Sequence, residues 1–172
     1  MKRPNVELLP LDNELIDRLQ EVAIADADPE EVMPPVTDVP GWTQTRRDAF
    51  RAFHRERLGG LSGPHREVHF AVVSRGEVVG SARLARRSET NVLETGTWIA
   101  RSKRNSGIGS ALIGVLLQKA AIEGATAVVA ETTDTNHAAL AVLRRHGAVF
   151  ESGAEGRVRA RLEVTPTAES AG

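Results

Sequence analysis

The residues best suited to chemistry lie in one short segment, residues 104–112, which reads Arg-Asn-Ser-Gly-Ile-Gly-Ser-Ala-Leu. The apolar residues that follow recur at helical spacing, so the segment leads into a helix. The first N–H groups of a helix have no intrahelical partner and bind an anion where side chains leave room, as at Gly107 and Gly109. Basic residues between positions 101 and 104 add positive charge. The segment therefore predicts a phosphate site; the structural alternative is a glycine-rich helix start with basic side chains in solvent.

Two common phosphate-binding loops do not fit this segment. A P-loop requires a Gly-Lys pair, and the chain has none. A dinucleotide-binding fingerprint requires a third glycine, but Leu112 stands at that position. The strands expected before the segment also form a hairpin meander rather than successive βαβ units, although Glu131 imitates the acidic residue that binds ribose in that fold. These departures leave a nucleotide-binding oxidoreductase as the third of three candidate functions.

The elements that position this segment follow from apolar periodicity and turn residues. The expected strands are 6–9, 68–74, 78–85, 92–99, 127–131, 149–151 and 158–164. Helices are expected from an Asp12 cap to before Pro29, from a Thr43 or Thr45 cap to Gly59, over 108–122, and over 136–146. Residues 26–42 are rich in proline without a helical or strand period, and we expect a long loop there. This order of an N-terminal helical half, an antiparallel meander, one β-loop-α-β unit and closing strands predicts an α+β fold.

The composition is that of one globular domain. The chain has 172 residues, of which 41% are hydrophobic and 26% charged. We expect the domain over residues 1–164 and a disordered tail over 165–172, where small and polar residues predominate. The net charge of −1 argues against nucleic-acid binding, and the absence of cysteine excludes thiolate nucleophiles and disulfides. With no signal peptide and no apolar run of about 20 residues, we expect a soluble, cytoplasmic protein with no membrane partner.

A family pattern extends around the glycine segment. Arg104, Gly107 and Gly109 occupy the fixed positions of [Arg/Gln]-x-x-Gly-x-[Gly/Ala], the acetyl-CoA loop of the GNAT superfamily of N-acetyltransferases, which the chain resembles. Residues 94–100 look like the fourth strand of that family, and residues 136–148 are similar to its Asn-x-x-Ala…Gly-Phe segment. The resemblance covers most of the chain between Phe70 and Phe150. It implies a mixed sheet of about six or seven strands flanked by helices, with a splay between strands four and five.

The resemblance also implies acetyl-CoA as co-substrate and assigns its binding residues. The backbone of Thr97, Trp98 and Ile99 would meet the pantetheine arm, because splayed strands leave backbone groups unpaired. Asn136 would hydrogen-bond the arm from the far side, and a helix N-cap is its alternative role. The pyrophosphate would be held by the N–H groups of the run that follows Arg104, namely Asn105, Ser106, Gly107, Ile108, Gly109 and Ser110.

Two glutamates compete for the role of catalytic base. Transfer to an amine requires the neutral amine, and a carboxylate can take up its proton. Glu131 matches the position of the catalytic glutamate in the ribosomal-protein alanine acetyltransferases of the superfamily, five residues before the Asn. Glu94, on the neighbouring strand, is the other candidate. The structural alternatives are a cross-strand partner for Glu94 and a helix-cap or salt-bridge residue for Glu131.

The general acid departs from the family pattern. Many members place a Tyr seven residues after the Asn to protonate the leaving thiolate, but Leu143 stands there and the chain has no Tyr. Water can protonate a thiolate whose thiol has a pKa of ~8.5. His146 is another candidate, with a last-turn histidine favoured by the helix dipole as its simpler interpretation. The missing Tyr keeps a second function open, that of a CoA-binding regulatory domain without turnover.

The other titratable residues give broader expectations. His65 and His69 lack a third ligand nearby, so no metal site is predicted, and we expect His54 and His137 on helix surfaces. The region between Arg18 and Arg46 predicts either a rim that attracts a cationic amine acceptor or a solvated surface. Its acidic residues are Glu21, Asp26, Asp28, Glu30, Glu31 and Asp38. The identity of the acceptor, longer acyl donors, and a homodimer as against a monomer stay open.

Overall fold

The computed structural model describes residues 2–167 as seven strands, five α-helices and three short 3-10 helices. The N-terminal half contains β1 (Val6–Pro10), α1 (Asn13–Asp26), α2 (Pro29–Val32), α3 (Gln44–Arg55) and η1 (Gly60–Ser62). The middle contains β2 (Glu67–Ser74), β3 (Glu77–Arg86), β4 (Val92–Ile99), η2 (Arg101–Lys103) and α4 (Ile108–Ile122). The chain then forms β5 (Ala127–Thr133), α5 (His137–Arg145), β6 (Val149–Ser152), η3 (Ala154–Gly156) and β7 (Arg157–Glu163). The predicted α+β class is confirmed.

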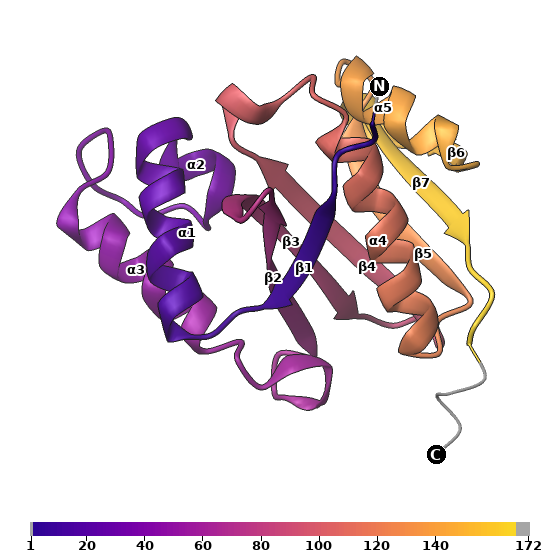
Figure 1. Cartoon of the computed structure of the whole chain (residues 1–172), viewed down its shortest axis with the longest axis horizontal. Helices are drawn as coiled ribbons and strands as arrows, with labels where there is room; N and C mark the ends of the chain where they lie inside the picture. The colour runs from indigo at the N-terminus through magenta and orange to yellow at the C-terminus, as the bar shows by residue number, and fades with distance from the viewer. Residues whose placement is uncertain (1, 168–172) are drawn as a thin grey trace.

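The strands form one mixed sheet in the order β1-β2-β3-β4-β5-β7-β6 (Figure 1). All neighbours are antiparallel except β4 and β5, which run parallel. Their pairing begins at Val92 with Ala127 and stops at Thr95 with Ala130, although β4 continues to Ile99 and β5 to Thr133. The two strands therefore separate towards their C-terminal ends, which confirms the predicted splay.

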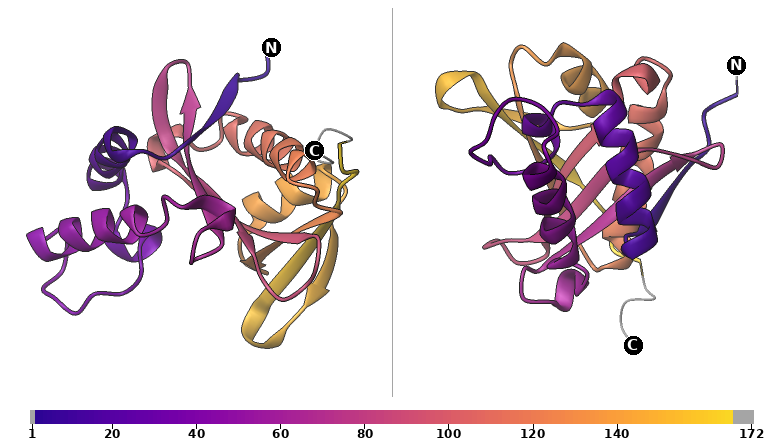
Figure 2. Two further views of the ribbon diagram at one scale, coloured as in Figure 1. Left: turned by 90° about the horizontal axis from the view of Figure 1, so that it is seen from below. Right: turned by 90° about the vertical axis from the view of Figure 1, so that its left-hand side faces the viewer.

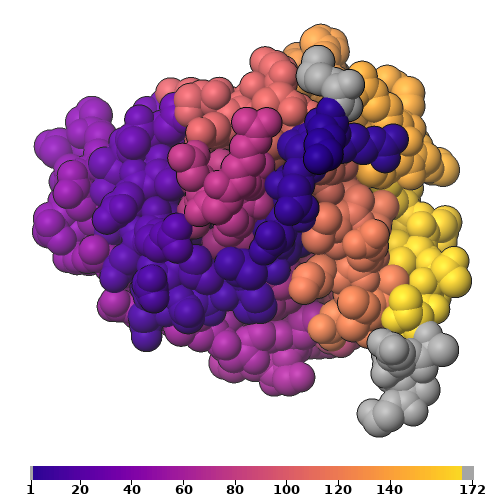
Figure 3. All heavy atoms as spheres, in the orientation of Figure 1, coloured from indigo at the N-terminus to yellow at the C-terminus, as the bar shows by residue number. Residues whose placement is uncertain are grey.

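Helices cover the sheet on both faces (Figure 2). Because side chains alternate along a strand, Leu93 and Val128 belong to the core that includes Leu112 of α4, and their neighbours face the other way. On the opposite face, α1 and α3 pack over the first strands around the fully buried Phe50. β1 lies beside α4 on the face seen in Figure 3.

Two local expectations in the N-terminal half need correction. The expected loop over 26–42 contains α2, which starts with a proline in its first turn, a position where the missing N–H costs no hydrogen bond. The rest of that loop is held by the buried Arg46, whose guanidinium donates to four backbone carbonyls, those of Val36, Asp38, Val39 and Gly41. Helix α3 has Thr43, one of the two predicted residues, as its cap, but it ends at Arg55, before Gly59.

The described part of the chain includes only the start of the expected C-terminal tail. Residues 165–167 are described, and the N–H of Thr167 donates to the carbonyl of Ala121 at 3.2 Å. The remaining residues of the predicted tail, 168–172, lie outside the described part of the chain. Within the described part, no helix is long and apolar enough to cross a membrane.

Candidate active site

The start of α4 is shaped for an anion. Gly107 caps the helix with φ +82°, a left-handed conformation that glycine adopts without steric cost. The first bond of helical spacing runs from the N–H of Ala111 to the carbonyl of Gly107, so the N–H groups of Ile108, Gly109 and Ser110 precede it. These three donors point out of the helix start, where the helix dipole favours negative charge.

Gly109 is not required by the packing of the protein itself. A Cβ at this position would meet Ile99 Cδ1 at 3.8 Å and Val142 Cγ2 at 3.9 Å, which are ordinary contact distances. Glycine within a helix costs up to about 1 kcal/mol relative to alanine. The packing of the protein therefore gives no reason for a glycine at position 109. A ligand that approaches the helix start would give one.

The loop before α4 is held by its own hydrogen bonds. Arg104 Nε donates to the carbonyl of Ile99 at 3.0 Å, and Ser106 Oγ donates to the carbonyl of Lys103 at 2.6 Å. Lys103 Nζ forms an ion pair at 3.0 Å with Glu77, the residue that directly follows the β2–β3 turn. Among the described residues Arg104 has no carboxylate partner, so of the predicted basic cluster its charge is the one left for an incoming anion.

Acidic residues of the N-terminal helices hold the same loop. Asp26 accepts from the backbone N–H of Ser102 at 2.8 Å and from its hydroxyl at 2.6 Å, and these bonds lower the pKa of Asp26. Arg101 Nη2 lies 2.9 Å from both Asp28 and Glu31, and the two hydrogen bonds raise the pKa of Arg101. Three of the six acids expected to form a rim for a cationic acceptor are therefore bound to this loop, and a fourth, Asp38, accepts from the N–H of Val39 at 2.8 Å.

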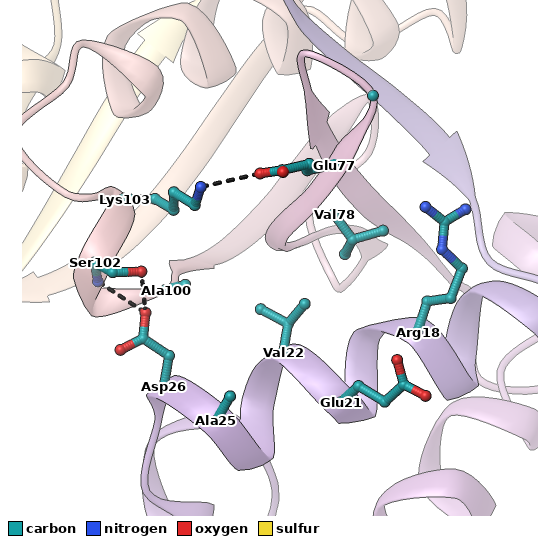
Figure 4. Close-up of a pocket in the computed structure, with 11 residues that line it drawn as sticks. Arg18, Glu21, Val22, Ala25, Asp26, Glu77, Val78, Ala100, Ser102 and Lys103 are labelled. Atoms are coloured by element: carbon teal, nitrogen blue, oxygen red, sulfur yellow. Dashed lines mark hydrogen bonds and ion pairs between the residues drawn. The ribbon is translucent and has the colours of Figure 1, made fainter.

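A cleft of about 380 Å³ opens beside these contacts, between α1, the β2–β3 turn and the β4–α4 loop (Figure 4). Val22 and Val78 line its middle, and Asp26, Ser102 and Lys103 lie at one side. Its lining includes none of the residues predicted for catalysis or for pyrophosphate binding. The cleft is thus separate from the splay.

The splay presents unpaired backbone beside the start of α4. Thr97, Trp98 and Ile99 pair with β3 on one side of β4 and lie beyond the last pair with β5 on the other. Trp98 packs against the α1/α3 core, whereas Ile99 packs against the α4 core. The edge of β4 that faces β5 is therefore held in place from both faces of the sheet and has no partner strand beyond Thr95, although the carbonyl of Ile99 accepts from Arg104 Nε.

Asn136 is the N-cap of α5, as its structural alternative predicted. Its side-chain oxygen accepts from the N–H of Ala139 at 3.2 Å. The side-chain amide has no partner among the described residues, and the residue is exposed. Asn136 can therefore cap the helix and donate to a ligand at the same time.

The structure brings the two candidate glutamates to the same face of the sheet but gives them different surroundings. Glu131 lies one residue beyond the last β4–β5 pair, with its side chain 61% exposed and its carboxylate 3.9 Å from Arg159. Glu94 lies within the paired part of β4, and its carboxylate accepts from Arg83 Nη2 at 2.8 Å. Both alternative roles are thus present: Glu131 lies past the β4–β5 pairing with an ion-pair partner in Arg159, and Glu94 is a cross-strand partner of Arg83.

Glu94 belongs to a network that sequence reasoning missed. Arg87 lies 3.8 Å from Glu94 and 3.5 Å from Glu67, and Glu67 accepts from His69 at 2.8 Å. Burial raises the pKa of Glu67, but the hydrogen bond with His69 and the charges of His69, Arg83 and Arg87 outweigh it and lower the pKa. The alternation of these residues on β2 and β3 was the available signal, but pairing across strands cannot be read from one sequence.

The prediction that His54 lies on a helix surface is wrong. Its side chain is 3% exposed and packs edge-on against Phe50, Phe53 and His69, and neither ring nitrogen has a hydrogen-bond partner among the described residues. Burial lowers the pKa of His54 to about 3, and the charges of His69 and Arg57 act in the same direction. His137 is exposed, as predicted. Within residues 2–167, no three His, Asp or Glu side chains converge to hold a metal ion.

The two positions considered for a general acid that protonates the leaving thiolate are Leu143 and His146, in and directly after α5. Leu143, at the place of the expected Tyr, is buried in the α4 core. His146 caps the C-terminus of α5, and its Nε2 lies 2.9 Å from the carbonyl of Ser110 on α4. His146 therefore contacts the start of α4.

Comparison with known proteins agrees with this geometry. The model of the Acetyltransferase (GNAT) family matches residues 27–148. Among solved structures, RimL, a ribosomal L7/L12 alpha-N-protein acetyltransferase in complex with coenzyme A, superposes with TM-score 0.73 at 18% identity, covering 96% of this chain and 95% of that one. Mycobacterium smegmatis RimJ in complex with a CoA disulfide gives TM-score 0.72 at 20% identity, covering 94% and 84%.

A third similar structure is Campylobacter jejuni N-acetyltransferase PseH in complex with acetyl coenzyme A, with TM-score 0.67 at 13% identity over 92% of this chain and 99% of that one. At these identities the structures establish the fold. No curated protein sequence matches the chain. The family model spans most of the chain, including both splayed strands, α4 and α5, and the protein therefore belongs to the GNAT family of acetyltransferases.

Proposed function

We propose that the protein transfers the acetyl group of acetyl-CoA directly to a primary amine of a peptide or small molecule. The observation that carries the proposal is the meeting of two features at one place. The three N–H groups at the start of α4 suit a pyrophosphate, and the unpaired edge of β4 suits the amides of a pantetheine arm. Both features belong to the segment matched by the family model.

The residues present fit acetyl-CoA, which supplies the activated thioester when it is bound. Gly109 leaves its position in the first turn of the helix without a side chain, and Gly107 gives the cap its left-handed conformation. Arg104 adds a positive charge that has no carboxylate partner among the described residues. Asn136, between β5 and α5, has a side-chain amide with no partner among the described residues. These groups bind and orient the donor, and none of them needs to change its protonation state.

The proton of the acceptor amine needs a base. A lysine-like amine of pKa ~10.4 lies about 3.4 units from its neutral form at neutral pH, which costs about 4–5 kcal/mol, whereas an α-amine of pKa ~8 costs about 1 kcal/mol. We assign this proton to Glu131, directly or through one water, because its carboxylate is exposed on the end of β5 that extends past its pairing with β4. Glu94 is the comparison: its carboxylate is hydrogen-bonded to Arg83 at 2.8 Å, and the residue lies within the paired part of β4.

The leaving thiolate needs no side-chain acid in this proposal. The chain contains no Tyr, and Leu143 cannot donate a proton. A thiol of pKa ~8.5 is a fair leaving group that water can protonate. The proposed reaction therefore has a base from the protein and an acid from solvent.

The class of acceptor follows from charge and from relatives. Asp26, Asp28 and Glu31 are bound to the β4–α4 loop, so the attraction expected for a polycationic acceptor is reduced. RimL is an alpha-N-protein acetyltransferase, and an α-amine places the smallest demand on a base. We favour an α-amine over a lysine-like amine, with acetyl-CoA in the cytoplasm as the donor.

Release of free CoA from acetyl-CoA in the presence of a panel of primary amines tests the proposal. We expect release that depends on the amine, together with an acceptor heavier by one acetyl group. The absence of Tyr favours one other candidate, a CoA-binding regulatory domain. That candidate predicts that acetyl-CoA binds and that no amine accelerates its cleavage.

A further inference from the structure

His146 makes a contact with α4 that its position at the end of α5 does not require. Its Nε2 lies 2.9 Å from the carbonyl oxygen of Ser110 and 3.1 Å from the hydroxyl of the same residue. Both residues are half-buried. The imidazole also lies beside Gly114, one turn later on α4, where a Cβ would be 3.7 Å from His146 Cε1, an ordinary contact distance. The imidazole ring of His146 thus packs against the first turn of α4.

The carbonyl contact determines which ring nitrogen carries the proton. A carbonyl oxygen only accepts hydrogen bonds, so an approach of 2.9 Å requires a proton on Nε2. The protonated Nε2 has no lone pair and cannot accept the proton of the Ser110 hydroxyl. The hydroxyl oxygen of Ser110 can accept a second hydrogen bond from the same Nε2–H, but the hydroxyl hydrogen must then point away from the ring.

Ser110 is the third residue of α4 and one of the N–H donors at the helix start. We infer that His146 is a positioning residue that keeps the Ser110 hydroxyl free to donate to the pyrophosphate of CoA. The inference rests on the proposed function. Acceptance from Nε2 also polarises the hydroxyl and strengthens it as a donor. His146 thereby acts on donor binding through Ser110, and not as a proton source for the thiolate.

Calorimetric titration with CoA and with pantetheine, which lacks the pyrophosphate, tests this role. Ser110→Ala should weaken CoA binding about tenfold or more, as expected for a lost hydrogen bond to a charged group. His146→Phe should weaken it about three- to tenfold, and the double variant should bind no more weakly than Ser110→Ala, because the histidine acts through the serine. Pantetheine binding should be unchanged in all three, and His137→Ala, on the exposed side of α5, should bind CoA like the wild type.

His146→Gln restores a donor near Nε2 and should recover most of the affinity, which a merely structural role for the ring would not. In kinetics, His146→Phe should raise the KM for acetyl-CoA with kcat nearly unchanged. Unchanged CoA affinity in His146→Phe, multiplying losses in the double variant, or an equal loss for pantetheine would overturn the inference while leaving acetyl transfer intact. A wild-type protein that does not bind CoA would overturn both together.

Discussion

His54 is a titratable side chain kept neutral inside the protein. The helical spacing around it does not distinguish it from a surface residue, because Phe50 and Phe53 already supply an apolar stripe. Its burial comes from the packing of α3 on the sheet, where His69 of β2 meets its ring. Burial lowers the pKa of His69 as well, although the hydrogen bond with Glu67 opposes the shift. Both histidines are therefore protonated more readily in the unfolded chain than in the folded one.

This difference predicts acid sensitivity. The folded pKa of His54 is about 3 against an ordinary value of 6.5, so the stabilising neutral form is fully favoured above pH 6.5 and is lost as the pH falls towards 3. The free energy of unfolding should fall in this window by up to about 1.4 kcal/mol per pH unit for each such group. His54→Phe should reduce the slope of the free energy of unfolding against pH by the contribution of one titrating group. Urea unfolding between pH 6 and 5 measures this slope. His137→Ala is the control with an unchanged slope, and an unchanged slope in His54→Phe would contradict the assignment.

Glu131 carries the residue-scale prediction for catalysis. Glu131→Gln should lower kcat by about 10²–10⁴ near neutral pH with little change in acetyl-CoA affinity, as expected when a positioned base is lost. The loss should shrink at higher pH, where solvent supplies more neutral amine, and it should be larger for a lysine-like amine than for an α-amine. The measurement is the pH dependence of kcat for both acceptors.

Glu94→Gln is the matched comparison for Glu131→Gln. It weakens the bond to Arg83, so we expect lower stability rather than a pH-dependent loss of rate. If Glu94→Gln shows the pH-dependent loss and Glu131→Gln keeps wild-type turnover, the two roles are reversed.

At the scale of elements, the segments with local signals were predictable. The glycine loop, the Asn136 cap, the β2–β3 hairpin and α4 each carry their information within a few residues, and all are present. The loop over 26–42 was predicted, but helix α2 and the contacts of Arg46 were missed. A proline-rich stretch has no periodicity, and the order of this one comes from an arginine several residues away. The Glu94 network was missed for a related reason: it requires three strands in register.

The end of β4 gives a test of how firmly the splay is held. A Cβ at Gly80 would lie 2.1 Å from the carbonyl oxygen of Trp98, so the backbone must shift. Gly80→Ala should therefore destabilise the protein by about 1–3 kcal/mol, as overpacking usually does, and should weaken acetyl-CoA binding because the same strand faces the splay. Thermal unfolding and calorimetry measure the two effects.

Gly153→Ala is the control for Gly80→Ala. A Cβ at Gly153 would lie 3.6 Å from its nearest neighbour, Arg157, and the residue is outside the splay. We expect little change in stability and none in acetyl-CoA affinity. Equal behaviour of the two variants would show that the end of β4 adapts freely.

At the scale of the whole molecule, the N-terminal helices and the β4–α4 loop form one unit. Asp26 at the end of α1 holds Ser102, and Asp28 and Glu31 hold Arg101, so the helices that cover one face of the sheet also brace the proposed donor site. Exposed ion pairs contribute little stability singly, at about 0–1 kcal/mol each. Their effect is to fix the loop before α4 relative to the rest of the chain.

The central claim is that acetyl-CoA binds at the start of α4, and thermal unfolding of the wild type and of Gly109→Val tests it most directly. Acetyl-CoA at about 100 times its Kd should stabilise the folded wild type by about 2.7 kcal/mol. For a domain of this size that corresponds to a rise in Tm of about 5–10 °C, with smaller rises for NAD and ATP. In Gly109→Val the added side chain occupies the approach to the helix start, so the rise should vanish. A Gly109→Val protein that folds and keeps the full rise with acetyl-CoA would contradict the claim.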